Sequence, residues 1–447
     1  MRRRRIAALL LSVTAVGVLS LTGCAQEADA PGTTGPAGTQ SANVETAEPI
    51  PTPTAEPTPD LTPGPMPTPI PRAELDYEAR ELSGTMTVAI AGQERVAELL
   101  DADHETKLTL PAGTEIRITS DSEISGLYMI WDLPPGEWSV VCGSFARRYG
   151  ERGFLHEFAE LPQGTESLTI ALPEGAVLCD IYAFTDGRLP DFVQLWEDPV
   201  DRADILLFPT HGDDEQLFFG PIMPWYAGEL GLSVQVVYLT NHYRDEPVRS
   251  HEQLNGLWTV GVTAYPVFGV FEDLLVDDLY VVSSLREALE LYDEDLVAAF
   301  QVEMIRRFRP QVIVGHDVNG EYGHGVHTLN SYCIRKAVEY AADGTYNGGS
   351  LAAYGVWDTP KLYLHMLREN QISLDYDRPL ERFGGRTAFE MAKAGYACHV
   401  SQQQWGFSVY PKGHIFDCSS FGLYRSTVGE DVEKNDLMEN LVPYAEQ

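Results

Sequence analysis

The sequence predicts two folds in one chain, an all-β domain of the sandwich type followed by an α/β domain. From about residue 73, short alternating apolar runs are separated by turn residues. From about residue 199, apolar strands alternate instead with segments of helical periodicity. Such a change of pattern is typical of a boundary between two domains. The 447 residues, 44% of them hydrophobic, suffice for two cores.

The N-terminus has the pattern of an export signal. Residues 2–5 are arginines, residues 6–18 are mostly apolar, and Leu21-Thr22-Gly23-Cys24 follows. That tetrapeptide resembles a bacterial lipobox, which implies cleavage before Cys24 and a lipid on its sulfur. We therefore expect residues 1–24 to be a lipoprotein signal and the protein to be anchored to the membrane outside the cytoplasm. An ordinary cleaved signal or a transmembrane helix are the alternatives, but the apolar run is short for a span of roughly 20 residues.

Residues 25–72 are predicted to be a disordered linker. They are rich in Pro and Thr, above all in Pro51–Pro59, and offer no core. In polyproline II geometry, at about 3.1 Å per residue, such a linker reaches on the order of 100 Å. It therefore acts as a tether.

The net charge limits the binding partners that we expect, and the number of cysteines limits the disulfide bonds. A formal charge of -35 repels phosphates and anionic bilayers, which excludes nucleic acid as a partner. Five cysteines follow Cys24, so at least one of them cannot pair within the chain. Cys142 and Cys179 either form a disulfide or are buried free thiols, and the sequence leaves both open.

Residues 73–198 are predicted to form the β-sandwich. The expected strands are 85–90, 107–110, 114–119, 126–131, 138–142, 167–171 and 177–184. Helical periodicity is limited to residues 96–100. The domain weakly resembles galactose-binding-like accessory modules. It is therefore interpreted either as a glycan-binding module or as a structural spacer.

Residues 199–447 are predicted to form a parallel, Rossmann-like α/β sheet. Its expected strands are 205–209, 234–239 and 312–314, and its expected helices are 216–229, 249–262 and 327–342. A further helix is indicated by Leu296, Phe300, Met304 and Phe308, which recur every four residues. Pro221 and Pro224 should kink the first helix. Ligands of such sheets bind at the carboxyl ends of the strands.

Two loops at those ends carry a candidate metal site. One is Thr210-His211-Gly212-Asp213-Asp214-Glu215 and the other is Glu321-Tyr322-Gly323-His324-Gly325-Val326-His327. Imidazole and carboxylate ligands suit zinc, and three protein ligands leave a position for water. We assign His211, Asp214 and His327 as ligands of one zinc ion per chain, with another divalent metal as the alternative. Asp213 is the candidate general base.

The second loop also supplies candidate donors. His324 and Tyr322 can stabilise the oxyanion that forms when water attacks an amide carbonyl. Each loop alone is weak evidence, since acidic residues often begin a helix and a His-x-x-His can be a surface loop. Two such loops in one α/β domain favour the metal site.

These residues carry a family resemblance. From about Ala203 to the C-terminus the chain resembles the PIG-L/LmbE-like zinc N-deacetylases, whose motifs usually read Ala-His-Pro-Asp-Asp-Glu and Gly-His-Pro-Asp-His. By position, the resemblance places the family's metal ligands, general base, catalytic histidine and oxyanion-contacting tyrosine on the residues assigned above. It also implies that Arg249, in Arg249-Ser-His-Glu252, contacts substrate. His399-Val-Ser-Gln402 is similar to a His-x-Ser-Gln found late in these enzymes.

The chain departs from the family motifs at three positions. Gly212 replaces a Pro, and Gly325-Val326 replaces Pro-Asp, so a partner that orients a histidine of the second motif is missing. The metal ligands are all retained by position. We therefore expect an extracytoplasmic, zinc-dependent hydrolase that removes acetyl groups from N-acetylated amino sugars or glycoconjugates. The rivals are an amidase for another N-acyl substrate and a non-catalytic, glycan-binding surface lipoprotein.

Overall fold

The computed structural model describes residues 75–447, apart from 92, 95, 245 and 275–281. The predicted signal (residues 1–24, with Cys24) and linker (residues 25–72) lie outside the described residues. Within the described part of the chain, no helix combines the length and the apolar character needed to cross a membrane.

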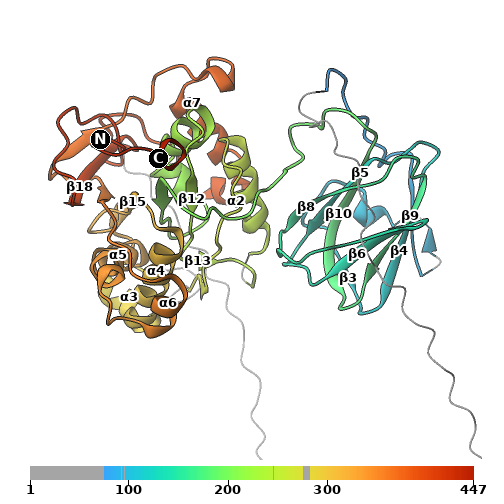
Figure 1. Cartoon of the computed structure of the whole chain (residues 1–447), viewed down its shortest axis with the longest axis horizontal. Coiled ribbons are helices and arrows are strands. Elements are labelled where there is room, and N and C mark those ends of the chain that lie inside the picture. Colours follow the sequence, from blue (N-terminus) through green and yellow to red (C-terminus); the bar gives the residue numbers. More distant parts are fainter. Residues whose placement is uncertain (1–74, 92, 95, 245, 275–281) are drawn as a thin grey trace, which may run out of the picture. The chain divides into compact units, whose positions relative to one another are not determined.

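The first part of the described chain consists of two antiparallel sheets (Figure 1). One sheet has the strand order β2-β1-β4-β9-β6-β7 and the other β3-β10-β5-β8. The strands are β1 (Thr87–Ile90), β2 (Gln93–Glu94), β3 (Leu108–Leu110), β4 (Thr114–Thr119), β5 (Gly126–Trp131), β6 (Trp138–Cys142), β7 (Phe145–Tyr149), β8 (His156–Glu160), β9 (Ser167–Leu172) and β10 (Ala176–Phe184). The short helix η2 (Ala97–Leu99) lies where helical periodicity was expected.

Both sheets contribute to one apolar core. Alternate residues of β4, such as Ile116 and Ile118, pack with Met129 and Trp131 of β5. Three strands have the predicted bounds, but β2, β7 and β8 were missed. In β7 the polar residues Arg147 and Arg148 interrupt the alternation, and pairing with β6 in a tight hairpin forms the strand instead.

The second part contains a six-stranded sheet with the order β12-β11-β15-β16-β18-β17. Its strands are β11 (Ile205–Leu207), β12 (Val234–Val236), β15 (Val312–Gly315), β16 (Lys361–His365), β17 (Gln371–Ser373) and β18 (Ser420–Ser426), and β13 (Thr240–Asn241) pairs with β14 (Phe271–Glu272) separately. The first four strands of that order are parallel, but β18 is antiparallel to β16. The predicted all-parallel sheet is therefore wrong at this edge. The chain enters β18 beside the carboxyl end of β16, so it runs in the opposite direction.

The sheet has an apolar core on each face. Leu206 and Ile313 pack in one cluster with residues of α4 and α5, while Leu207 and Val314 pack in another with residues of α2 and α7. Figure 1 shows α3 to α6 gathered on one side and α2 and α7 on the other. The α-helices are α1 (Asp214–Leu217), α2 (Val248–Thr259), α3 (Leu285–Leu291), α4 (Glu294–Phe308), α5 (Gly325–Ala342), α6 (Gly348–Tyr354) and α7 (Ala388–Tyr396). Shorter or irregular helices are η3 (Met223–Glu229), η4 (Glu321–Gly323), η5 (Glu381–Phe383), η6 (Val400–Trp405) and η7 (Tyr444–Glu446).

Two helix predictions need correction. The helix expected at 216–229 is broken into α1 and the π-helix η3, with Pro221 in the break and Pro224 in the first turn of η3. In α4, Phe300, Met304 and Phe308 are buried as expected, but Leu296 is 61% exposed. Leu296 lies in the first turn of α4, beyond the edge of the core that the later turns cover.

Candidate metal centre

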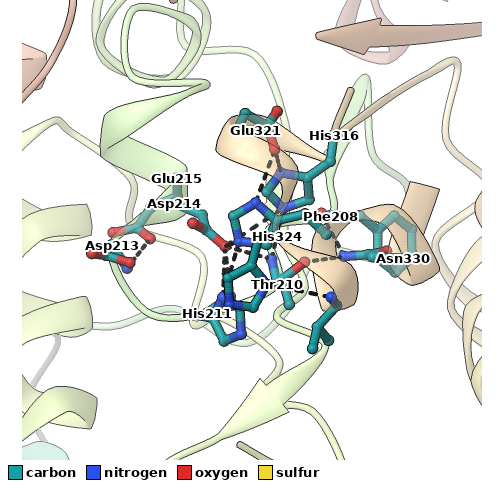
Figure 2. A network of polar contacts seen from close by, with 12 residues as sticks. Phe208, Thr210, His211, Asp213, Asp214, Glu215, His316, Glu321, His324 and Asn330 are labelled. Carbon is teal, nitrogen blue, oxygen red and sulfur yellow. Dashed lines mark hydrogen bonds and ion pairs between the residues drawn. The ribbon is translucent and has the colours of Figure 1, made fainter. Parts of the chain in front are cut away.

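Both predicted loops leave the same edge of the sheet. The strands β11 and β15 are parallel neighbours, with Leu207 opposite Val314, so the segments that follow them emerge side by side. The first segment leads into α1 and the second into α5. Figure 2 shows His211 and Asp214 facing His316 and His324 of the second segment. The β11–β15 pairing thus brings together residues more than a hundred positions apart.

The three predicted ligands form a compact set of donor atoms. The His211 Nδ1 atom lies 3.1 Å from His327 Nε2 and 3.3 Å from Asp214 Oδ2, and the last two atoms are 3.2 Å apart. A tetrahedral zinc ion with ligand distances of about 2.0–2.1 Å separates its ligand atoms by about 3.3 Å. The spacing and the chemistry of these donors fit zinc.

Two neighbouring histidines offer alternative ligand sets. The groups His211–His324–His327 and Asp214–His316–His327 each have ligand atoms within 4.8 Å of one another. However, His316 Nε2 accepts the N–H of Thr210 at 3.0 Å, and His324 Nδ1 accepts the N–H of Val326 at 3.3 Å. With these lone pairs engaged, both side chains are poorer metal ligands than the predicted three.

A buried carboxylate, Glu321, holds three imidazoles at the base of the site. Its Oε2 atom lies 2.7 Å from His316 Nδ1 and 2.9 Å from His327 Nδ1, and its Oε1 atom lies 2.8 Å from His365 Nδ1. By accepting from His327 Nδ1, the carboxylate leaves Nε2 of that ring directed at the candidate metal position. Burial alone would lower the pKa of His327, but Asp214 and Glu321 raise it to about 10. The ring therefore attracts a cation, either a proton or a metal ion.

The sequence analysis assigned no role to this network of Glu321, His316 and His365. The feature that could have indicated this network is the position of His316 and His365 along the chain. Both residues come at the carboxyl ends of strands, β15 and β16, where the predicted site also lies.

We expect Glu321→Gln to weaken metal binding about 10- to 100-fold, because the uncharged amide no longer orients and polarises His327. The measurement is a competition titration of zinc against a chromophoric chelator. Glu303→Gln, an exposed position of α4, is the control and should bind as the wild type does. Unchanged affinity in Glu321→Gln would show that the carboxylate does not support the ligand.

Asp213, the predicted base, adopts an unusual backbone conformation. Its φ of 147° lies in a region that costs free energy for a residue other than glycine. Its N–H donates to Glu215 Oε2 at 3.0 Å, and Glu215 Oε1 lies 2.8 Å from His399 Nε2. The Glu215–His399 pair thus fixes the loop at this position. Here His399, from the late His-x-Ser-Gln segment, acts on the backbone.

The carboxyl group of Asp213 is suited to proton transfer. Burial and the charge of Asp214 raise its pKa to about 7, against the opposing effects of Arg249 and His399. A base whose pKa lies near neutrality can both accept and release a proton under ordinary conditions. Burial would also raise the pKa of Asp214, but His327 and hydrogen bonds hold it well below its usual range, as a ligand requires.

Arg249, predicted to contact substrate, is buried against the first loop. Its Nη2 atom donates to the carbonyl of Gly212 at 2.9 Å and lies 3.7 Å from Asp213 Oδ1, while Nη1 lies 3.5 Å from Asp273 Oδ2. In this position the guanidinium stabilises the loop. Its contact with substrate stays a prediction.

The two glycine departures lie in different surroundings. A Cβ atom on Gly212 would come within 2.5 Å of the flexible Gln253 side chain, which would have to shift. A Cβ atom on Gly325 would lie 2.3 Å from the carbonyl oxygen of Ser284. The backbone of Ser284 thus excludes a proline at position 325, whereas at position 212 only a side chain stands in the way.

His324 and Tyr322, the predicted donors, border the ligand set. The ring of Tyr322 lies 5.6 Å from that of His324 and 5.5 Å from that of His327, and 41% of the residue is exposed. Burial and the nearby His327 and His211 lower the pKa of His324. The ring is therefore neutral, and with Nδ1 accepting from the backbone its proton is on Nε2. Burial raises the pKa of Tyr322 well above its usual value, so its hydroxyl keeps its proton.

Comparison with known proteins points to deacetylases, although no family model matches the chain. The 1D-myo-inositol 2-acetamido-2-deoxy-alpha-D-glucopyranoside deacetylase 1 of Catenulispora acidiphila is 28% identical over 196 residues, which cover 39% of this chain and 59% of the relative. A deacetylase of the same name from a Nocardioides species is 29% identical over 218 residues, covering 42% and 69%. The chain thus spans less than two thirds of the first relative. The N,N'-diacetylchitobiose deacetylase of Pyrococcus horikoshii aligns at 15% identity with a TM-score of 0.33, covering 48% of this chain and 73% of that one.

Proposed function

We propose that the protein is a zinc-dependent N-deacetylase of the PIG-L/LmbE type that acts on an N-acetylated amino sugar or glycoconjugate outside the cytoplasm. The observation that carries the proposal is the donor set of His211, Asp214 and His327, whose atoms lie 3.1 to 3.3 Å apart beside Asp213. A hydrolytic zinc centre needs three such ligands and an adjacent base.

The side chains around this set can carry out amide hydrolysis. Zinc bound by the three ligands would supply a Lewis acid that polarises the amide carbonyl and lowers the pKa of a water molecule. Asp213 takes the proton of the attacking water and later gives it to the nitrogen of the leaving amine. His324, through Nε2–H, and Tyr322, through its hydroxyl, donate to the developing oxyanion. The products are acetate and a free amine.

The substrate class rests on the curated relatives and on the predicted address. Both relatives are named for an acetamido sugar joined to inositol. A lipid on Cys24 and the linker would place the present chain at the outer face of the membrane, where N-acetylated glycans are available. The proposed substrate is therefore an N-acetylglucosamine-containing glycan or conjugate.

One observation favours a second candidate, an amidase for larger acyl groups. The ring of Tyr322 lies 5.0 Å from Phe407 and 6.3 Å from Phe416, so an aromatic wall adjoins the ligand set. Such a wall can pack against an acyl chain longer than acetyl.

A panel of substrates tests both candidates. The purified full chain, loaded with zinc, is incubated with N-acetylglucosamine, its oligomers, an inositol-linked N-acetylglucosamine, and the corresponding N-hexanoyl compounds. We expect acetate and free amine in equal amounts from the acetylated sugars, abolished by a chelator and restored by zinc. Faster turnover of the hexanoyl compounds would favour the second candidate. If a zinc-loaded protein releases no acid from any substrate, the glycan-binding lipoprotein replaces both.

A further inference from the structure

A second group of metal-ligating side chains lies away from the candidate catalytic centre. It consists of Asp132, which follows β5, Cys179 on β10, and His251 on α2. Their ligand atoms all lie within 4.8 Å of one another, and the residues are only 5%, 0% and 1% exposed. The group thus joins the β-sheet part of the chain to a helix of the α/β part. Neither the proposed deacetylation nor its residues account for it.

A β-bulge aims Cys179 at this group. The register of β10 against β5 shifts between Leu178 and Asp180, which places Cys179 at the irregularity. Leu178 and Ile181 both face the core shared by the two sheets, whereas Cys179 belongs to a separate cluster. The bulge therefore turns two consecutive polar side chains, those of Cys179 and Asp180, away from that core.

A chain of hydrogen bonds engages one ring nitrogen of His251. The Tyr128 hydroxyl donates to the carbonyl of Phe192 at 3.4 Å and lies 2.7 Å from His156 Nδ1, while His156 Nε2 lies 2.8 Å from His251 Nδ1. The Nδ1 atom of His251 is therefore engaged by His156, and Nε2 is the nitrogen left to bind a ligand. When His251 donates through Nδ1, its neutral ring carries a lone pair on Nε2.

The other ring nitrogen of His251 has no partner within the described residues. The His251 Nε2 atom is buried and makes no hydrogen bond there. Burial, with His104 and Lys107, lowers the pKa of His251 to about 3, so the ring is neutral. A buried neutral imidazole with one nitrogen held by a neighbour and the other bare has the form that binds a metal ion.

The charges around the group favour a cation. Asp132 and Asp180 are buried carboxylates, and Lys107, whose Nζ lies 2.7 Å from Asp132 Oδ1, balances only one of them. His104 Nδ1 lies 2.9 Å from Asp180 Oδ2. A divalent ion, together with loss of the Cys179 proton, would bring these side chains to neutrality, since the thiolate adds one negative charge and the ion two positive charges.

We propose that Asp132, Cys179 and His251 bind a second divalent metal ion of the zinc class, which links the β-sandwich to helix α2. One sulfur, one nitrogen and one oxygen ligand suit zinc better than calcium or magnesium, which prefer oxygen alone. On binding, the Cys179 S–H bond breaks, the sulfur–metal bond forms, and the proton leaves to solvent. Burial and the neighbouring carboxylates raise the pKa of Cys179 to about 12, so the metal-free thiol keeps its proton.

Cobalt distinguishes this site from the catalytic one. The catalytic ligands are histidine and aspartate only, so a thiolate-to-cobalt charge-transfer band in the near ultraviolet reports the second site alone. The full chain, stripped of metal and titrated with Co²⁺, should bind about two equivalents and develop this band. Cys179→Ser should lose the band and one equivalent and keep the visible cobalt spectrum of the catalytic site. Cys142→Ser, which alters the other sandwich cysteine, should behave as the wild type does.

Two further variants make the test decisive. His251→Gln, with its fold checked by circular dichroism, should also lose the band, which covers the case that Cys179→Ser fails to fold. His327→Ala should keep the band while losing the catalytic equivalent, so the outcome does not depend on the proposed deacetylation. A wild type that shows no near-ultraviolet band at saturating Co²⁺, or a folded Cys179→Ser that retains it, overturns the proposal.

Discussion

Asp213→Asn should reduce kcat/KM for deacetylation by about 10²- to 10⁴-fold while the zinc content stays that of the wild type. The amide matches the carboxylate in shape but cannot accept the proton of the attacking water. Metal retention is expected because Asp213 contributes none of the three atoms that form the donor set. Acetate release and metal analysis on the same preparation measure both quantities.

The pH profile provides a readout that a structural defect would not reproduce. The base must be ionised, so wild-type kcat/KM should rise as pH increases through the pKa of Asp213. That pKa is raised to about 7 by burial and by Asp214, and bound zinc will lower it from there. In Asp213→Asn, kcat/KM should no longer rise with pH on the acidic side of the profile. Asp377→Asn, at an exposed position, is the control and should keep both the wild-type pH profile and the wild-type rate. A variant that loses zinc along with activity would contradict the assignment of Asp213 as base alone.

His327→Ala should abolish both zinc binding and deacetylation. Loss of a direct ligand should cost more than the about 100-fold in affinity that can follow loss of an orienting partner. It also leaves the Glu321 carboxylate, which His327 contacts at 2.9 Å, without one of its three imidazoles. Equilibrium dialysis against zinc buffers and acetate release are the measurements.

Chelation of the wild type provides the comparison. Removing zinc from the wild type should give the same inactive state, and added zinc should restore the wild type but not His327→Ala. His414→Ala, at an exposed histidine, should retain the metal. An active, zinc-bound His327→Ala would contradict the assignment of His327 as a ligand, and with it both alternative groups, since each of them contains His327.

Strands and helices whose apolar residues recur at a regular spacing could be predicted from the sequence. The strands 114–119, 126–131 and 138–142 have their expected bounds, and the α/β class follows from the alternation of strands and helices. The candidate metal ligands could be proposed because two loops each held several metal-ligating residues within a few positions. β7 was missed because its arginines break the alternation, and the antiparallel β18 because strand direction depends on which edge the returning chain enters.

The sequence by itself determined which residues form the candidate ligand set, since motif spacing places His211 with Asp214 on one loop and His324 with His327 on the other. Only the tertiary structure decided which side chains support them. Glu321 holds His316 and His365 because β15 and β16 pair in parallel and end together. Asp132, Cys179 and His251 meet because a bulge in β10 faces a helix of another domain. Local patterns encode neighbours along the chain, whereas such contacts arise from the packing of distant segments and leave no period in the sequence.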